Sequence, residues 1–144
     1  MITAMFVIRT YQDTDLEDII QLWERCDLTR PWNNPEIDIF RKIAQKDDLF
    51  LVAVKNQQII ATLMGGYDGH RGWMNYLAVH PHHQRNGVAT ALIQQLEKRL
   101  TALGCPELQL LIAKEFIDIQ NFYEQLGYEE QEVVCLSKRL IPDQ

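Results

Sequence analysis

The chain has 144 residues, of which 47% are hydrophobic and 24% charged, and its formal net charge is −6 at pH 7. This length and composition predict one soluble globular domain, residues 1–144, with a substantial core. No apolar run approaches the roughly 18 residues of a membrane-spanning helix, so we expect no membrane insertion. The acidic charge argues against nucleic acid as a partner, because phosphate backbones bind clustered Lys and Arg. A cationic amine fits this charge better.

The cysteines and the first residues predict a cytoplasmic location. Cys26, Cys105 and Cys135 are odd in number, widely spaced and form no C-x-x-C pair. We therefore expect reduced, buried thiols. Residues 1–10 lack the charged head, apolar middle and small-residue cleavage site of a secretory signal.

The first third of the chain predicts a strand and two helices. Residues 6–11 alternate apolar and polar side chains, which predicts a strand. Apolar residues then recur at helical spacing on one predicted helix face: Leu16, Ile19, Ile20, Trp23 and Cys26. A second helix is predicted over about residues 36–45, with Asn34 as its cap and Pro35 at its first position. Its expected inward residues are Ile37, Phe40, Ile43 and Ala44.

Three strands are predicted next. Residues 49–55 and 58–66 read as two strands joined by a tight turn at Asn56 and Gln57. Residues 73–79 form the third strand. A proline two residues later cannot continue a sheet ladder, so this strand ends there.

A helix and a parallel strand follow. Apolar residues recur over residues 89–103 at three- and four-residue steps, and Gly104 supplies the stop of this helix. Residues 108–113 are a short apolar run reached by a helical crossover, so this strand should pair in parallel with residues 73–79. Another helix is predicted over about residues 117–126.

Two terminal strands, residues 128–134 and 135–140, complete the predicted order β-α-α-β-β-β-α-β-α-β-β. This order predicts an α/β fold, a single domain with a mixed sheet and helices on both faces.

The glycine loop before the long helix carries most of the functional information. It consists of Gln84, Arg85, Asn86, Gly87, Val88, Ala89 and Thr90. A glycine loop that opens a helix presents unpaired N–H groups at the positive end of the helix dipole, which suits a phosphate-bearing ligand. The G-x-G-x-x-G and G-x-x-x-x-G-K-[ST] patterns are absent, which argues against dinucleotide and P-loop sites. A simple turn residue before a helix is the plainer interpretation of Gly87.

Two motifs resemble those of one enzyme family. The spacing Gln84-x-x-Gly87-x-Ala89 resembles motif A (Q/R-x-x-G-x-G/A) of the GNAT N-acetyltransferases, and residues 122–128 resemble motif B, in which a short helix ends in a glycine and an aromatic residue. The resemblance covers residues 6–140. It implies the GNAT-like fold and transfer of an acetyl group from acetyl-CoA, the co-substrate, to a primary amine without a metal.

Further short stretches are similar to a subgroup of small bacterial members of this family. They are residues 22–28, 30–33 and 64–72. This similarity says little about the acceptor.

The resemblance also implies residue roles. The loop would cradle the pyrophosphate of acetyl-CoA, and the backbone of Leu77, Ala78 and Val79 would bind the pantetheine amides and stabilise the oxyanion. Tyr123 in motif B would be the catalytic general acid that protonates the departing thiolate. The alternative for Tyr123 is an ordinary half-buried aromatic residue on a helix.

The general base is not assigned by the sequence. Glu115, Asp118 and His70 are candidates, and a water relay is an equal alternative. Phe116 stands where the family commonly places an asparagine that contacts the pantetheine, which puts that contact in doubt.

Two other clusters have competing interpretations. His80, His82 and His83 lack a further ligand at zinc spacing, so we expect them near the coenzyme phosphates and not on a metal. Residues 32–34 either shape the amine pocket or form a capped helix start packed by Trp32.

The expected partner is an amine-bearing acceptor, either a small molecule or a protein, and whether the chain forms a homodimer is left open. Two rivals to the enzyme hypothesis are a non-catalytic coenzyme A-binding module and a generic phosphate-ligand protein.

Overall fold

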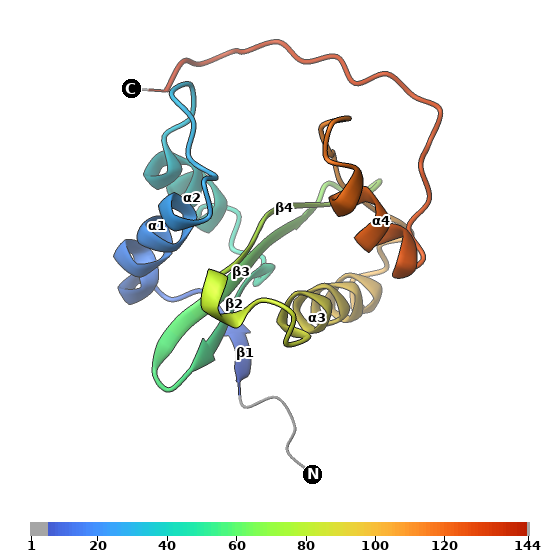
Figure 1. Ribbon diagram of the computed structural model, residues 1–144. Coiled ribbons are helices and arrows are strands. Elements are labelled where there is room, and N and C mark those ends of the chain that lie inside the picture. Colours follow the sequence, from blue (N-terminus) through green and yellow to red (C-terminus); the bar gives the residue numbers. More distant parts are fainter. Residues whose placement is uncertain (1–5, 144) are drawn as a thin grey trace.

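The computed structural model describes residues 6–143, and within this range five strands form one mixed sheet in the order β1-β2-β3-β4-β5. The helices α1 and α2 cover one face, and α3 and α4 cover the other (Figure 1). The bounds are β1 Val7–Thr10, α1 Leu16–Arg25, α2 Pro35–Ile43, β2 Phe50–Lys55, β3 Gln58–Tyr67, β4 Gly72–Val79, α3 Val88–Ala102, β5 Leu108–Gln109 and α4 Ile117–Gln125. The predicted single α/β domain with helices on both faces is confirmed.

On the first face, α1 and α2 pack on the sheet through Trp23 and Ile39, both 0% exposed. The predicted cap of α2 is confirmed, because the side-chain oxygen of Asn34 accepts hydrogen bonds from the N–H groups of Glu36 and Ile37. The predicted inward face was partly wrong, since Phe40 is 51% exposed. One residue turns a helix by about 100°, so contact through Ile39 rotates Phe40 toward solvent.

On the second face, α3 lies close to the sheet at Gly65. A side-chain carbon added at Gly65 would lie 2.4 Å from Cδ1 of Leu96 on α3. Leu92, Ile93 and Leu96 are nearly inaccessible to solvent there. The absence of a side chain at Gly65 therefore lets the helix carrying the glycine loop sit directly on the sheet.

A β-bulge interrupts β4. Thr62 on β3 pairs with Ala78, but Met64 pairs with Asn75, so two residues of β4 oppose one residue of β3. Tyr76, in the bulge, has φ 54°, which is uncommon for a non-glycine residue. The buried Thr62 hydroxyl accepts a bond from Trp23 Nε1 (2.8 Å) and donates one to the Tyr76 carbonyl oxygen (2.9 Å).

The bulge lies beyond the point where β4 and β5 part. The two strands are parallel, as predicted, but pair only at Gly72 with Leu108 and Trp73 with Gln109. The predicted strand over residues 108–113 was therefore too long, because a ladder ends where the neighbouring strand diverges. Residues 110–113 continue without strand pairing.

The two predicted C-terminal strands were wrong. Residues 128–143 contain neither helix nor strand, and they run from the end of α4 across the molecule toward α1 and α2 (Figure 1). A strand needs a partner edge, and this segment departs from the sheet that would supply one. Asp143 at its far end accepts a hydrogen bond from the N–H of Asn34 (2.8 Å) and pairs with Arg41 (2.9 Å).

The cysteines agree only partly with the expectation of buried thiols. Cys26 and Cys105 are partly buried, whereas Cys135 is exposed because it belongs to the unpaired C-terminal segment. Across residues 6–143, no helix combines the length and the apolar character of a membrane span.

Candidate active site

The glycine loop has the geometry expected of an anion site. Gly87 precedes the first residue of α3 in the left-handed conformation, with φ 79° and ψ 6°. A side-chain carbon added to Gly87 would have no atom within 4 Å, so the space above the helix start is open. The first-turn N–H groups of a helix have no partner inside it, and they stand at the positive end of its dipole. The loop therefore fits a pyrophosphate, and Arg85 adds a cation beside it.

Side chains fix the loop to the end of β4. Gln84 Nε2 donates a hydrogen bond to the carbonyl oxygen of Val79 (3.3 Å), and the thiol of Cys26 reaches the same oxygen from α1 (3.4 Å). Between them, His80 Nδ1 accepts the N–H of His82 (3.1 Å). These contacts hold the end of β4, with Leu77, Ala78 and Val79, directly before the glycine loop.

The histidines show no metal-like arrangement. Within the described range, no three His, Cys, Asp or Glu side chains come together in a group able to hold an ion. Burial, with smaller contributions from Arg25 and the other two histidines, lowers the pKa of His80. The lowered pKa favours the neutral imidazole, and His80 caps the turn before the loop.

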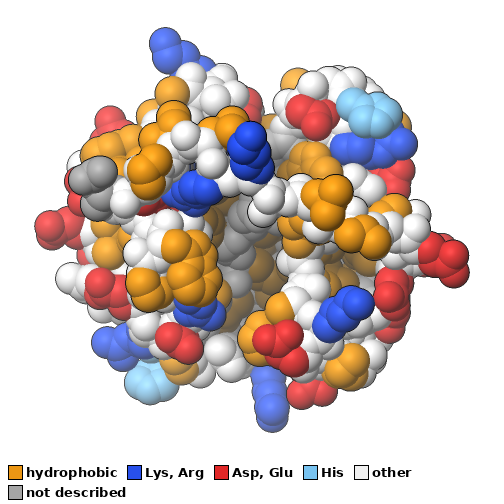
Figure 2. Space-filling view, turned by 90° about the horizontal axis from the view of Figure 1, so that it is seen from above, with side chains coloured by type: hydrophobic (Ala, Val, Ile, Leu, Met, Phe, Trp, Pro, Cys, Tyr) orange, Lys and Arg blue, Asp and Glu red, His pale blue; other side chains and the backbone are white. Residues whose placement is uncertain are grey.

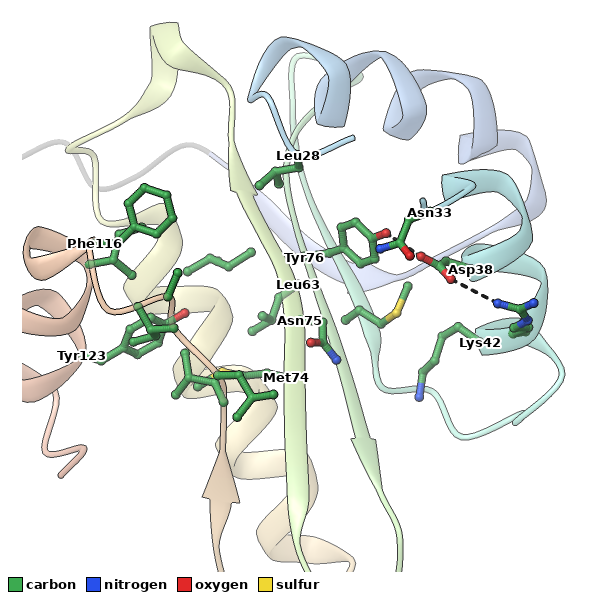
Figure 3. Close-up of a pocket in the computed structure, with 18 of the residues that line it drawn as sticks. Leu28, Asn33, Asp38, Lys42, Leu63, Met74, Asn75, Tyr76, Phe116 and Tyr123 are labelled. Carbon is green, nitrogen blue, oxygen red and sulfur yellow. Dashed lines mark hydrogen bonds and ion pairs between the residues drawn. The ribbon is translucent and has the colours of Figure 1, made fainter. Parts of the chain in front are cut away.

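A cavity of about 680 Å³ opens where β4 and residues 110–113 diverge. Its walls come from the middle of β4, from residues 110–113, from α2 and from α4 (Figure 3). Seen from above, the molecule is hollowed between the α1–α2 side and the α4 side (Figure 2). Leu77 and Tyr123 line the cavity, whereas residues 84–90 lie beyond it. The cavity therefore lies in the gap between β4 and residues 110–113.

Tyr123 lies in the wall of the cavity. Its ring is buried, 4% exposed, yet it lines the cavity, and its hydroxyl points from α4 toward β4 (Figure 3). Among the described residues, the hydroxyl has no hydrogen-bond partner. Burial raises the pKa of Tyr123 to about 12, so the phenol keeps its proton at neutral pH.

The end of motif B holds Tyr123 in place. Gly127 adopts φ 96°, which turns the chain so that the N–H of Tyr128 bonds to the carbonyl oxygen of Tyr123 (3.1 Å). The hydroxyl of Tyr128 donates to Glu97 on α3 (2.6 Å), and the two tyrosine rings meet edge to face. Burial and the bond to Glu97 raise the pKa of Tyr128. The helix that carries Tyr123 is thereby tied to the helix that carries the glycine loop.

The opposite wall of the cavity holds a carboxylate that the sequence did not suggest. Asp38 on α2 accepts a hydrogen bond from the hydroxyl of Tyr76 (2.5 Å), and both residues line the cavity. Arg41 lies 3.6 Å from Asp38 but is bonded more closely to Asp143 (2.9 Å). Burial and the bond to Asp38 raise the pKa of Tyr76. No local pattern marked this pair, because α2 and β4 meet only through the fold.

The sequence candidates for a general base lie elsewhere. Glu115, Asp118 and His70 are all exposed, and none of them lines the cavity. Phe116, 47% exposed, does line it and presents an aromatic face where an amide was expected. The structure therefore brings Asp38, and not the predicted candidates, to the cavity.

The structure places residues 32–34 at the start of α2 and beside the cavity. Trp32 is 65% exposed, so the expected packing of this residue was wrong. Asn34 caps α2, and Asn33 lines the cavity while its side-chain oxygen accepts a hydrogen bond from Arg139 (3.2 Å).

Comparison with known proteins identifies the family of this chain. Residues 16–128 match the family described as Acetyltransferase (GNAT) family. The chain belongs to this family. The family uses acetyl-CoA, and both motifs noted in the sequence lie inside the matched range.

Solved structures show the same fold. AAC(6')-Iy, in complex with the bisubstrate analogue CoA-S-monomethyl-acetylneamine, is 21% identical with a TM-score of 0.76, over 96% of this acetyltransferase and 100% of that chain. The ribosomal-protein-S18-alanine N-acetyltransferase from Escherichia coli is 22% identical with a TM-score of 0.75, over 88% and 79%. Glucosamine-6-phosphate N-acetyltransferase from Arabidopsis thaliana is 20% identical with a TM-score of 0.71, over 96% and 100%.

The loop assignment predicts that Gly87→Pro abolishes acetyl-CoA binding measured by calorimetry. Proline holds φ near about −65° and cannot adopt the 79° found at Gly87. Gln84→Ala, which leaves the backbone donors in place, should have a much smaller effect.

Gly104→Pro is the matched control, because Gly104 has φ 85° at the other end of α3. It should cost stability and leave acetyl-CoA affinity intact in the folded fraction. A folded Gly87→Pro protein that binds acetyl-CoA normally would contradict the pyrophosphate assignment.

Proposed function

We propose that this acetyltransferase moves the acetyl group of acetyl-CoA directly to a primary amine, without a covalent acyl-enzyme. One observation carries the proposal: β4 and residues 110–113 diverge into a cavity that has a protonated phenol on one side and a carboxylate on the other. Direct transfer needs both reactants present together, and the cavity has two distinct walls to receive them.

The residues on the coenzyme side act by binding and by proton donation. The N–H groups of residues 85–90 would hold the pyrophosphate. The backbone of Leu77, Ala78 and Val79 would bind the pantetheine amides on the side facing away from β3, through groups other than the Val79 carbonyl oxygen, which Gln84 and Cys26 already bond. An N–H near Val79 would stabilise the oxyanion. Bound acetyl-CoA supplies an activated thioester, and Tyr123 would donate its proton to the thiolate as the amine displaces it.

The accessible hydroxyl of Tyr123 favours an enzyme over a non-catalytic coenzyme A-binding module. A module that only binds coenzyme A needs no proton donor at the cavity, whereas the ring of Tyr123 is buried and its hydroxyl opens onto the cavity. In an ordinary core position such a hydroxyl would be paired.

The acceptor side favours a cationic primary amine. Asp38 is the carboxylate among the lining residues, and it is oriented by the hydroxyl of Tyr76. The two cations that also line the cavity, Arg41 and Lys42, are paired with Asp143 and Asp47. It would bind the ammonium form of the acceptor, and the amine would lose its proton to water before attack, so a small molecule or an α-amine is preferred over a protein lysine. The names of two similar structures, for ribosomal-protein alanine and for glucosamine-6-phosphate, also specify amine acceptors.

Two finer expectations belong to the proposal. The stretches at residues 22–28, 30–33 and 64–72 suggest the YpeA subgroup of the family. The reduced cysteines and the acidic charge suggest a cytoplasmic protein that does not bind nucleic acid.

The role of Tyr123 predicts that Tyr123→Phe lowers kcat by roughly 100-fold while acetyl-CoA affinity stays unchanged, because only the proton donor is removed. Acetyl-CoA consumption over a panel of primary amines measures the effect. Tyr11→Phe is the control, since Tyr11 stacks on Phe50 outside the cavity. Loss of stability with normal turnover would assign Tyr123 to the core, and no turnover by the wild type with any amine would favour the binding module.

The acceptor assignment predicts that Asp38→Asn raises KM for a cationic amine by about tenfold with little change in kcat, because the asparagine oxygen still accepts the Tyr76 bond but carries no charge. Asp18→Asn on the exposed side of α1 makes the same change in net charge and should do nothing. kcat/KM should rise with pH toward the pKa of the amine, as the neutral fraction grows. A plateau near pH 7 with a lysine peptide would reveal an efficient base and contradict this mechanism.

A further inference from the structure

The C-terminal segment is fastened to the start of α2. It crosses the molecule from α4 and comes to lie beside α1 and α2 (Figure 1). There Arg139 donates a hydrogen bond to the side-chain oxygen of Asn33 (3.2 Å), and Asp143 accepts the N–H of Asn34 (2.8 Å). Asn33 lines the cavity and Asn34 caps α2. The segment is therefore joined to the helix that supplies the carboxylate of the cavity.

Asp143 is the centre of these contacts. One of its oxygens accepts the N–H of Asn34, and the other lies 2.9 Å from Arg41 and 2.6 Å from Arg139. Its side chain is 3% exposed. The N–H of Asn34 and the two guanidiniums lower the pKa of Asp143 more than its burial raises it. Asp143 therefore carries a negative charge at neutral pH and shares it between two guanidiniums.

Arg41 stands between two carboxylates. Its Nη2 is 2.9 Å from Asp143, whereas its Nη1 is 3.6 Å from Asp38. The shorter distance is that of a charge-assisted hydrogen bond, and the longer one exceeds it. Arg41 and Asp38 are three positions apart on α2, so the two side chains can reach each other. Arg41 is therefore bonded to Asp143 although Asp38 is within its reach.

The charges beside the cavity balance only while Asp143 is ionised. They are two carboxylates and two guanidiniums, Asp38, Asp143, Arg41 and Arg139, together with the separate ion pair of Lys42 and Asp47. Without the charge of Asp143, this wall would have one net positive charge, which repels a cationic acceptor. Arg41 would then have Asp38 as its nearest carboxylate.

We infer that Asp143 is a positioning residue that keeps Arg41 from neutralising Asp38. The inference rests on the proposed function, in which Asp38 binds the ammonium group of the acceptor. Asp143 does not line the cavity, so it acts through Arg41. A guanidinium paired closely with Asp38 would compete with the acceptor for the same oxygens, whereas the neutral hydroxyl of Tyr76 leaves the carboxylate its charge. The C-terminal segment thereby sets the preference of the acceptor wall for a cation.

Kinetics of the full-length protein test this role, with the panel amine that the wild type acetylates fastest. Asp143→Asn should raise KM for this amine several-fold, toward the roughly tenfold rise expected of Asp38→Asn, with kcat unchanged. The asparagine oxygen still accepts the N–H of Asn34, but it no longer attracts Arg41 by charge. Adding Arg41→Gln should restore KM, because no guanidinium remains to neutralise Asp38. Arg139→Gln is the matched control: it removes a cation while Asp143 still holds Arg41, so KM should not rise.

A crystal structure of Asp143→Asn reports the same contact without turnover. Arg41 should approach Asp38 to about 3 Å. The inference is wrong if Arg41 stays away from Asp38 in the folded variant, or if KM is unchanged while Asp38→Asn raises it. An equal rise of KM in Arg139→Gln, or no restoration by Arg41→Gln, would show that Asp143 only fastens the segment, and would also overturn it. If Arg41 moves onto Asp38 but Asp38→Asn itself leaves KM unchanged, the positioning contact stands and the proposed acceptor wall fails.

Discussion

A single buried hydroxyl links α1, on one face of the sheet, to the β4 bulge beside the cavity. Thr62 is 0% exposed, and its oxygen joins the indole of Trp23 on α1 to the carbonyl of Tyr76 in the β4 bulge. Leaving either buried partner unsatisfied would cost about 1–3 kcal/mol. The bulge is therefore fixed by the packing of α1 against the sheet, and it is not a loose irregularity.

The bulge has a cost that its surroundings offset. Tyr76 has φ 54°, a conformation that non-glycine residues seldom adopt. Its ring stacks on Trp23 with centroids 3.8 Å apart, and its hydroxyl bonds to Asp38. The same contacts that stabilise the strained residue orient the carboxylate of the proposed acceptor wall. The strained residue, the bulge and the proposed acceptor wall therefore form one connected structure between α1, α2 and β4.

Local chemistry explains which parts of the site the sequence could predict. The glycine loop and the helix after it could be predicted, because a glycine before a helix and an apolar stripe along it are patterns of neighbouring residues. The capping role of Asn34 could be predicted for the same reason. The position of Asp38 at the cavity could not be predicted, since it depends on a hydrogen bond from Tyr76, a residue 38 positions away on another element. Placement of Tyr123 at a cavity likewise needed the divergence of β4 from residues 110–113.

The failed strand predictions have one physical cause. Residues 108–113 and 128–140 have strand-like sequences, but a strand exists only where a neighbour offers a ladder. β4 leaves β5 after Trp73, so β5 stops at Gln109. The C-terminal residues depart from the sheet entirely and leave Val134 and its neighbours exposed. In both places the sequence favours extended structure, but the predicted strand partners are absent from the described sheet.

Tyr76 in the bulge directly precedes Leu77, Ala78 and Val79, the residues proposed to bind the pantetheine of acetyl-CoA. The acetyl-CoA affinity of Thr62→Val, compared with that of Thr62→Ser, tests most directly whether the anchored bulge positions these residues. Valine keeps the shape of threonine but leaves Trp23 and Tyr76 without their shared partner, whereas serine keeps the hydroxyl. We expect Thr62→Val to lose stability in chemical denaturation and, in its folded fraction, to bind acetyl-CoA more weakly, with Thr62→Ser close to the wild type. A folded Thr62→Val protein of reduced stability and unchanged acetyl-CoA affinity would show that the site does not depend on this anchor.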